Sequence, residues 1–378
     1  MNRLLPLVDL RGDAREIGVQ HGRAAKAHVA HNVDAYRRRF TEWGHIPRDE
    51  VRLRAEAYRQ VIEDASPDYA AAMEGIAEGA GQDVLDIVAI NVRYEMMYSE
   101  FAERGKRRLA GPLAGGGCTS FALLPQFTAS GHLIIGQNWD WVPESQGLLV
   151  RTHGHGPDQL AFTEAGIVGA KIGLNDAGIG LAINGLVSDR DSWSPPRVPF
   201  HVRCAQILAA RSLRDAQGAI TEKKRSCSAN FLIAQGGNSG AIVDVEAAPD
   251  NECVLLPTRG YLVHTNHFLD PDALGIWQPL AEDRPSTMTR FARIHDVMRS
   301  WEAKNRSVSV EDLKRILRNH TGAPNSLCRH PDVSLPSDDR YETVVSVIMD
   351  LDAKEMYVAS GTPCTARYRL FPLSGAPA

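Results

Sequence analysis

The chain has 378 residues, of which 43% are hydrophobic, and a formal net charge of -4. This length fits one large layered domain with an extensive core, and the slightly acidic balance argues against a general nucleic-acid binder. No apolar stretch is long enough to span a membrane. The six scattered cysteines contain no C-x-x-C pair, which is typical of a reduced, cytoplasmic protein.

The first part of the chain is predicted to be mainly helical. Apolar residues recur at helical spacing from residue 13 to residue 40, and Asp13 can cap the first turn. Similar patterns predict further helices over residues 51–62, 67–80 and 83–98. All of these helices precede a glycine-rich segment that ends at Gly117.

After Gly117 the pattern changes to short strands separated by turns. A first set of strands is expected over residues 119–124, 132–137, 148–152, 160–163, 169–174 and 178–184. Helices at 200–213 and 213–223 separate it from strands at 230–234, 240–245, 252–256 and 261–264. The chain is expected to end with helices 287–301 and 310–320 and strands 343–351 and 355–359. Periodicity alone therefore predicts an α+β protein with antiparallel sheets.

The segment Gly115-Gly116-Gly117-Cys118 places a cysteine at the start of the first of these strands. Three glycines give the backbone freedom to adopt a strained scissile geometry at little steric cost. A terminal α-amine titrates near neutrality and can act as the base for its own side chain. We therefore predict a cut between Gly117 and Cys118. On local chemistry alone, an ordinary buried cysteine after a glycine loop is the alternative.

Two motifs together carry a family resemblance: G-C-T-S at residues 117–120 and G-Q-N-W-D-W at residues 136–141. They resemble the acyl-coenzyme A:6-aminopenicillanic acid acyltransferase family, whose members are self-processing N-terminal-nucleophile hydrolases. The resemblance spans most of the chain and includes I-G-V-Q-H-G at 17–22, T-N-H-F at 265–268 and G-T-P-C at 361–364. It implies a four-layer αββα sandwich, with residues 1–117 as the small subunit and 118–378 as the large subunit of one catalytic domain.

The resemblance also implies roles for individual residues. Cys118 is the expected nucleophile, and its thiol attacks the Gly117 carbonyl in the precursor. Asp140 corresponds to an aspartate that holds the new α-ammonium; a turn aspartate is the alternative. Asn266 corresponds to an asparagine that donates its side-chain N–H to the oxyanion.

Two further residues are weaker candidates. The backbone N–H of Asn184 is a second candidate donor to the oxyanion. A family arginine maps within a residue or two of Arg340, for which a plain surface arginine is the alternative. His264 and His267 flank Asn266 and are expected to be structural, because the α-amine already supplies the base.

These residues predict an amidohydrolase or acyltransferase that acts on an N-acyl amide. The acyl group passes to Cys118 as a thioester, an amine leaves, and water or another amine accepts the acyl group. Neither a cofactor nor a metal ion is expected, although acyl-CoA can serve as co-substrate, and the expected protein partner is the chain's own cleaved fragment. The acyl group and the amine do not follow from a shared fold. The alternatives are a papain-like cysteine protease and an uncleaved, non-catalytic member of the fold.

Overall fold

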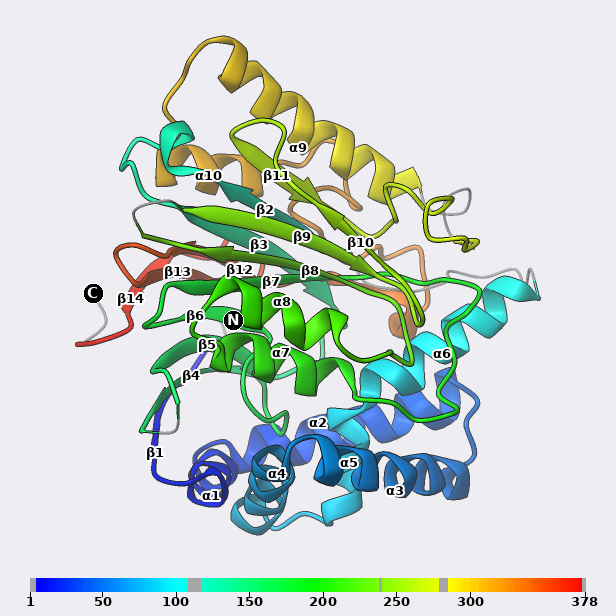
Figure 1. Ribbon diagram of the computed structural model, residues 1–378. Coiled ribbons are helices and arrows are strands. Elements are labelled where there is room, and N and C mark those ends of the chain that lie inside the picture. The colour runs from blue at the N-terminus through cyan, green and yellow to red at the C-terminus, as the bar shows by residue number, and fades with distance from the viewer. Residues whose placement is uncertain (1–4, 108–116, 155, 238–239, 279–284, 376–378) are drawn as a thin grey trace.

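The computed structural model describes residues 5–107, 117–154, 156–237, 240–278 and 285–375. Most of the glycine-rich segment predicted to precede the cut, including Gly115 and Gly116, lies outside these residues. Two β-sheets form the centre of the described chain, and helices lie on their outer faces (Figure 1). The predicted α+β sandwich of two sheets between helical layers is confirmed.

The smaller sheet has six strands among the described residues. In spatial order they are β11 (Tyr261–His264), β2 (Thr119–Leu123), β3 (Ile134–Trp141), β12 (Glu342–Asp350), β13 (Glu355–Ser360) and β14 (Arg369–Pro372). All neighbours are antiparallel. The outer face of this sheet is covered by α9 (Pro285–Ala303) and α10 (Val310–Leu317), seen above it in Figure 1.

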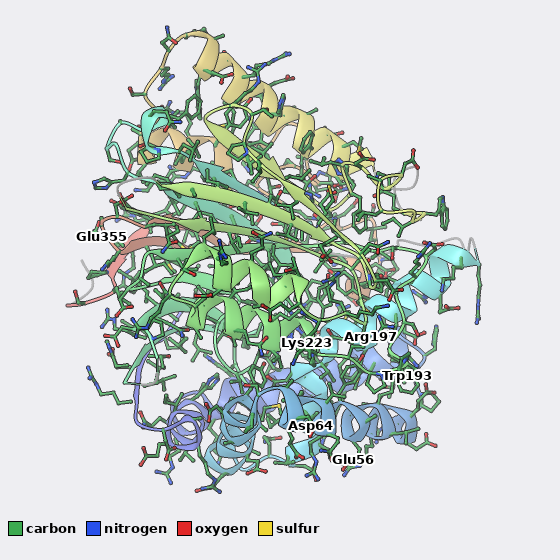
Figure 2. All side chains as sticks on the ribbon, in the orientation of Figure 1. Glu56, Asp64, Trp193, Arg197, Lys223 and Glu355 are labelled. Atoms are coloured by element: carbon green, nitrogen blue, oxygen red, sulfur yellow. The ribbon has the colours of Figure 1, made fainter. Side chains whose placement is uncertain are left out.

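The larger sheet has eight strands in the described part of the chain. They are β1 (Leu7–Arg11), β4 (Gly147–His153), β5 (Gln159–Glu164), β6 (Ile172–Asn175), β7 (Ile179–Gly185), β8 (Ala229–Gln235), β9 (Ala241–Ala247) and β10 (Glu252–Leu255). The outer face carries α7 (Phe200–Ala209) and α8 (Leu213–Thr221). β2 and β3 pack against β7 across the interior, and closely packed side chains fill the space between the sheets (Figure 2).

The segment before Cys118 is mainly helical in its described residues, as predicted, apart from β1. Its helices are α1 (Ala14–Ala24), α2 (Lys26–Arg38), a π-helical turn (Arg39–Trp43), α3 (Arg48–Ala65), α4 (Pro67–Ala80), α5 (Val84–Asn91) and α6 (Arg93–Lys106). The helix predicted over 13–40 is therefore interrupted: Ala25 leaves helical geometry with φ -112° and ψ 22°. Val92, with φ -107° and ψ 17°, likewise divides the predicted helix 83–98.

Close packing of α1 on α4 explains the glycines of the motif at 17–22. A Cβ atom on Gly18 would lie 2.2 Å from the carbonyl oxygen of Ala72, and one on Gly22 would lie 2.4 Å from that of Ile76. Only glycine allows two helix backbones to approach so closely.

In the described residues, no helix has the length and apolar character needed to cross a membrane.

Buried polar contacts attach the helical segment to the larger sheet. Glu164 on β5 accepts hydrogen bonds from Arg93 and from Tyr36 in the helices. The hydroxyl of Tyr58 donates to Ser226 over 2.8 Å and that of Tyr94 donates to the carbonyl of Ser228 over 2.6 Å. Both sides of the predicted cut thus contribute to one core.

Candidate active site

Three strand ends of the smaller sheet, those of β2, β3 and β11, lie close to Cys118. Cys118 directly precedes β2, whose antiparallel neighbours are β3 and β11. Because antiparallel neighbours run in opposite directions, the last residues of β3 and β11 lie beside the first residue of β2. Thr119 pairs with Asn138, and His264 pairs with Ser120. The sheet register therefore brings Asp140 and Asn266 to the same edge as Cys118.

Cys118 lies at this edge with only 3% of its surface exposed. Its Sγ atom is 3.9 Å from the backbone carbonyl oxygen of Asp140, to which it donates a weak hydrogen bond. Burial, followed by the negative charge of Asp140, raises the pKa of the Cys118 thiol to about 11. The thiol is therefore mostly protonated at neutral pH, and a base would be needed to form the reactive thiolate.

The two oxygen atoms of the Asp140 carboxyl group have different surroundings. Its Oδ1 atom accepts a hydrogen bond of 2.7 Å from the hydroxyl of Thr343 on β12, whereas Oδ2 is buried without a partner among the described residues. A Cβ atom on Gly117 would lie 2.8 Å from Oδ2, so this oxygen faces the backbone at the predicted cut. Burial raises the pKa of Asp140 to about 7, and the charges of Arg290 and Arg329 oppose that rise.

Arg290, near the start of α9, contacts the backbone of Cys118 directly and was not predicted from the sequence. Its Nη1 atom donates to the carbonyl oxygen of Cys118 over 2.6 Å, and its Nη2 atom donates to Oδ1 of Asn266 over 3.1 Å. The helix pattern held a usable signal. Arg290 stands four and eight residues before Ile294 and Met298, which are both fully buried, so it occupies the apolar face of α9.

The arginine predicted at the site, Arg340, is not brought to it. Its guanidinium donates to the carbonyl oxygens of Leu335 and Val333 in the loop before β12. Arg329 takes the position near the cut instead, because a Cβ atom on Gly117 would lie 2.2 Å from its Nη1 atom. The family arginine was expected within a residue or two of Arg340, and Arg329 lies outside that range.

The two asparagine candidates lie where the sheets meet. Asn266 donates through Nδ2 to the carbonyl oxygen of Gly185, 3.0 Å away on the opposite sheet. Asn184 accepts a hydrogen bond of 2.6 Å from the hydroxyl of Ser120, and its Nδ2 atom is buried with no partner in the described chain. Both amides are therefore close to β2, with N–H groups still available.

The flanking histidines make contacts of their own. His264 is fully buried, and its Nε2 atom lies 2.8 Å from Oε1 of Glu246. The Nδ1 atom of His267 lies 3.0 Å from the hydroxyl of Thr287, and burial lowers the pKa of His267 to about 4. These contacts agree with the structural role expected for both residues.

A buried cation lies behind the site. The ammonium group of Lys171 is 3.3 Å from the centre of the Trp139 ring and 2.6 Å from Oε2 of Glu164. Burial lowers its pKa to about 7, although Glu164 opposes this effect. The positive charge favours the thiolate form of Cys118. Nothing in the sequence pattern singles out this lysine.

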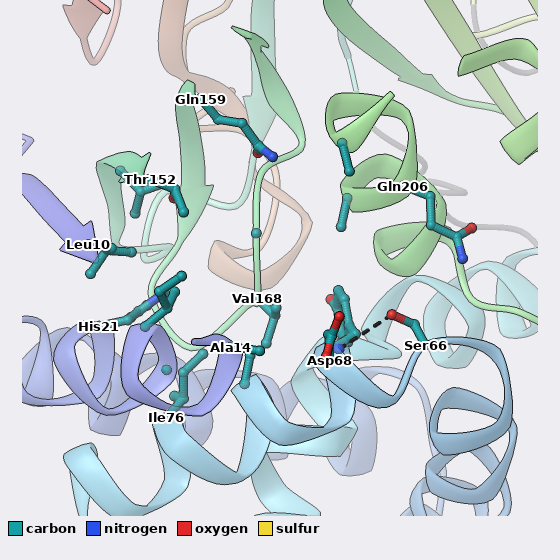
Figure 3. A pocket seen from close by; sticks show the side chains of 18 residues that line it. Leu10, Ala14, His21, Ser66, Asp68, Ile76, Thr152, Gln159, Val168 and Gln206 are labelled. Atoms are coloured by element: carbon teal, nitrogen blue, oxygen red, sulfur yellow. Dashed lines mark hydrogen bonds between the residues drawn. The ribbon is translucent and has the colours of Figure 1, made fainter. Parts of the chain in front are cut away.

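A cavity of about 190 Å³ lies elsewhere, between α1, α4 and the larger sheet (Figure 3). Its lining is mainly apolar and includes Ala14, Ile76 and Val168 together with His21. None of the predicted site residues lines this cavity. We therefore assign the candidate site from the residues around Cys118, independently of this cavity.

A model of the family described as "Acyl-coenzyme A:6-aminopenicillanic acid acyl-transferase" matches residues 127–364. This range includes Asp140, Asn184 and Asn266 and begins after Cys118. The "Acyl-coenzyme A:6-aminopenicillanic-acid-acyltransferase 40 kDa form" of Emericella nidulans is 26% identical over 363 residues, which cover 94% of this chain and 92% of that protein.

Solved structures also match at low sequence identity. A conjugated bile acid hydrolase from Clostridium perfringens is 14% identical, with a TM-score of 0.47 over 64% of this chain and 89% of that one. A penicillin V acylase from Agrobacterium tumefaciens is 12% identical, with a TM-score of 0.43 over 64% and 83% of the two chains. The family model matches more than half of the residues of this chain. The chain therefore belongs to the acyl-coenzyme A:6-aminopenicillanic acid acyl-transferase family.

Proposed function

We propose that the chain is the precursor of a self-processing enzyme that uses Cys118 to cleave or transfer the acyl group of an N-acyl amide. The observation that carries this proposal is the unpartnered Oδ2 atom of Asp140, which faces Gly117 at the predicted cut. A buried carboxylate oxygen without a partner is costly unless something supplies a donor. The α-ammonium group that cleavage creates at Cys118 is such a donor.

The processing step would begin with attack of the Cys118 sulfur on the Gly117 carbonyl carbon. A thioester bond forms, the Gly117–Cys118 C–N bond breaks, and the released amine takes up a proton. Water then hydrolyses the thioester, which gives a carboxylate at Gly117 and restores the thiol. Arg290 supports this geometry, since it holds the Cys118 carbonyl oxygen at 2.6 Å.

The mature reaction would use the same groups on an external amide. The α-amine of Cys118 removes the thiol proton, and Asp140 holds the protonated amine in place. Asn266 is oriented by Arg290 at its Oδ1 atom and offers an Nδ2 hydrogen to the developing oxyanion. For Asn184 the sequence predicted the backbone N–H as second donor to the oxyanion; we propose its unpartnered side-chain Nδ2 atom for this role instead.

The two fragments would remain together after the cut. Residues 5–107 contribute Tyr36, Tyr58, Tyr94 and Arg93 to buried contacts with strands from beyond residue 118. We therefore propose a heterodimer of fragments 1–117 and 118–378. Its substrates would be small N-acyl amides, with acyl-CoA as a possible acyl donor, and its free cysteines suit a reducing compartment such as the cytoplasm.

Intact-mass analysis of purified protein tests this proposal. Wild type is expected to give two copurifying fragments, and sequencing of the larger one should begin at Cys118. Cys118→Ala should remain one chain, whereas the control Cys253→Ala, on β10, should be cut like wild type. A single wild-type chain, or a different new N-terminus, would contradict the mechanism and favour the uncleaved or papain-like alternatives.

A further inference from the structure

Two cysteines and two histidines from distant parts of the chain meet at one point beside the smaller sheet. They are His320, Cys328, His330 and Cys364, called here the Cys2His2 cluster, and their ligand atoms all lie within 4.8 Å of one another. His330 is central: its Nε2 atom is 3.1 Å from Nε2 of His320, 3.7 Å from Sγ of Cys328 and 3.4 Å from Sγ of Cys364.

Hydrogen bonds alone do not account for these contacts. One ring nitrogen either donates a single hydrogen bond or accepts through a single lone pair. The Nε2 atom of His330 nevertheless faces three potential ligand atoms at short distance. A single cation among the four atoms would satisfy all of them at once.

The spacing of the ligand atoms around His330 suits one kind of cation. Zn–S bonds are about 2.3 Å and Zn–N bonds about 2.0 Å, so the ligand atoms of a tetrahedral zinc site lie roughly 3.3 to 3.8 Å apart. The measured separations from His330, between 3.1 and 3.7 Å, fall at or close to this range. Two thiolates with two imidazoles is also a ligand set typical of zinc. We propose that the Cys2His2 cluster binds one zinc ion.

The backbone already holds the ligands in place. The Cys328 N–H donates to the carbonyl of Asn319 over 3.0 Å, and the His330 N–H donates to that of Pro324 over 3.0 Å. Cys364 comes from the G-T-P-C motif, in the turn that follows β13. Zinc would therefore tie the loop after α10 to this turn. Since four protein ligands leave no open position, the site is structural and not catalytic.

The sequence alone predicts no metal site here. Cys328, His320 and Cys364 lie 2, 10 and 34 residues from His330 along the chain, so the four ligands form no compact zinc motif. Only the return of the chain through β12 and β13 brings Cys364 to the other three ligands. A zinc ion bound here would differ from the expectation of a metal-free protein. Three of the four ligand residues are at least partly exposed, so a chelator could reach the ion.

The zinc site would also support the candidate active site. Arg329 stands between two of the ligands, and its N–H donates to the Thr343 hydroxyl over 3.0 Å. That hydroxyl donates to Asp140. The adjacent Leu327 carbonyl accepts a 2.7 Å hydrogen bond from Asn138 on β3. A metal at the cluster would thus fix the short segment 327–330 that orients Asp140.

Metal analysis of the purified chain tests the proposal. The measurements use the Cys118→Ala background, so that neither the nucleophile's thiol nor processing affects the result. After reconstitution with Zn²⁺ under reducing conditions and desalting, mass spectrometry should find about one zinc per chain. Cys364→Ser and His320→Ala should each lower this content at least tenfold, whereas the control Cys253→Ser should retain it. His320 is exposed, so its variant should fold even if the buried ligands are needed for folding.

Cobalt gives a second readout that depends on ligand type. Co²⁺ in place of zinc should show the intense visible absorption of tetrahedral thiolate coordination, and Cys364→Ser should lose it. Chelation should lower the thermal unfolding temperature of the background protein and leave that of Cys364→Ser unchanged. Zinc contents near zero after reconstitution, or equal contents in the control and the ligand variants, would overturn the proposal. A Cys328–Cys364 disulfide that persists under the reducing conditions would overturn it as well.

Discussion

The Thr343 hydroxyl fixes one oxygen of the Asp140 carboxyl group, at 2.7 Å, and leaves the other oxygen facing the Gly117 backbone. In the proposed mechanism, the side chain would therefore be oriented before any amine exists for it to hold. An oriented acceptor requires no rearrangement when the ammonium group appears, which is how preorganised sites gain rate. The two oxygens therefore have different environments, and the Asp140→Asn variant tests what each contributes.

Asp140→Asn should separate processing from catalysis. The amide keeps the shape and the Thr343 contact but lacks the charge that holds the α-ammonium. Processing should continue, because the precursor has no free amine to hold, while amide turnover by the cleaved form should fall at least a hundredfold, or roughly 3 kcal/mol in barrier. The processing half-life and the turnover of the cleaved fraction are the two measurements.

Thr343→Val is the matched control for this variant. It keeps the negative charge and removes only the hydroxyl that orients Oδ1. Turnover should fall less than in Asp140→Asn, because the charge that would hold the α-ammonium is retained and only one orienting hydrogen bond is lost. Equal losses of processing and turnover in Asp140→Asn would instead mean that Asp140 supports the architecture around Cys118.

Asn266→Ala tests the oxyanion donor. The variant removes an Nδ2 donor and the Oδ1 acceptor of Arg290, and turnover should fall about a hundredfold or more. Folding should persist, because α9 and β11 retain their apolar contacts. His267→Asn, a change at the neighbouring residue, should keep turnover near that of wild type. A near-wild-type rate for Asn266→Ala would remove the residue from the site.

Sequence patterns predicted most of the helices and strands, but they missed β1 and β14 and did not predict the breaks within helices. Apolar spacing predicts the helices on both sides of Ala25 and of Val92, yet nothing in that spacing distinguishes one long helix from two packed at an angle. The strand β1 was missed because it is short and pairs with β4, far along the chain, in the only parallel pairing of the described sheets. Such pairing depends on tertiary contacts that local propensity does not encode.

The candidates Cys118, Asp140 and Asn266 came from motifs shared with the family, and their catalytic roles stay predictions. Cys118, Asp140 and Asn266 stand at the ends of predicted strands, and antiparallel pairing is enough to bring such ends together. Arg290 and Arg329 come from a helix face and a loop, and their approach depends on how α9 and the loop after α10 pack over the sheet. Arg340 was chosen because a family arginine maps within a residue or two of it, and such a match does not determine where a long side chain points.

The last prediction concerns pH and follows from the raised pKa of the Cys118 thiol. In the uncut chain this pKa is about 11, so the thiolate fraction is small at neutral pH and grows as pH rises. If the thiolate is the attacking species, self-cleavage should accelerate with pH between about 7 and 9, by up to roughly tenfold per unit. Acidification should slow it.

The cleaved enzyme should behave differently, because its α-ammonium places a positive charge beside the thiol. That charge favours the thiolate, so the turnover profile should lie at lower pH than the processing profile. In Asp140→Asn the repulsion between the carboxylate and the thiolate disappears, and the processing profile should shift toward acid, since Asp140 ionises near pH 7 and raises the thiol pKa. The pH dependence of processing is measured from cleavage time courses of freshly denatured and refolded precursor. The pH dependence of turnover is measured with the cleaved enzyme over the same pH range. Coincident profiles for processing and turnover would show that the amine released at Cys118 does not activate the thiol.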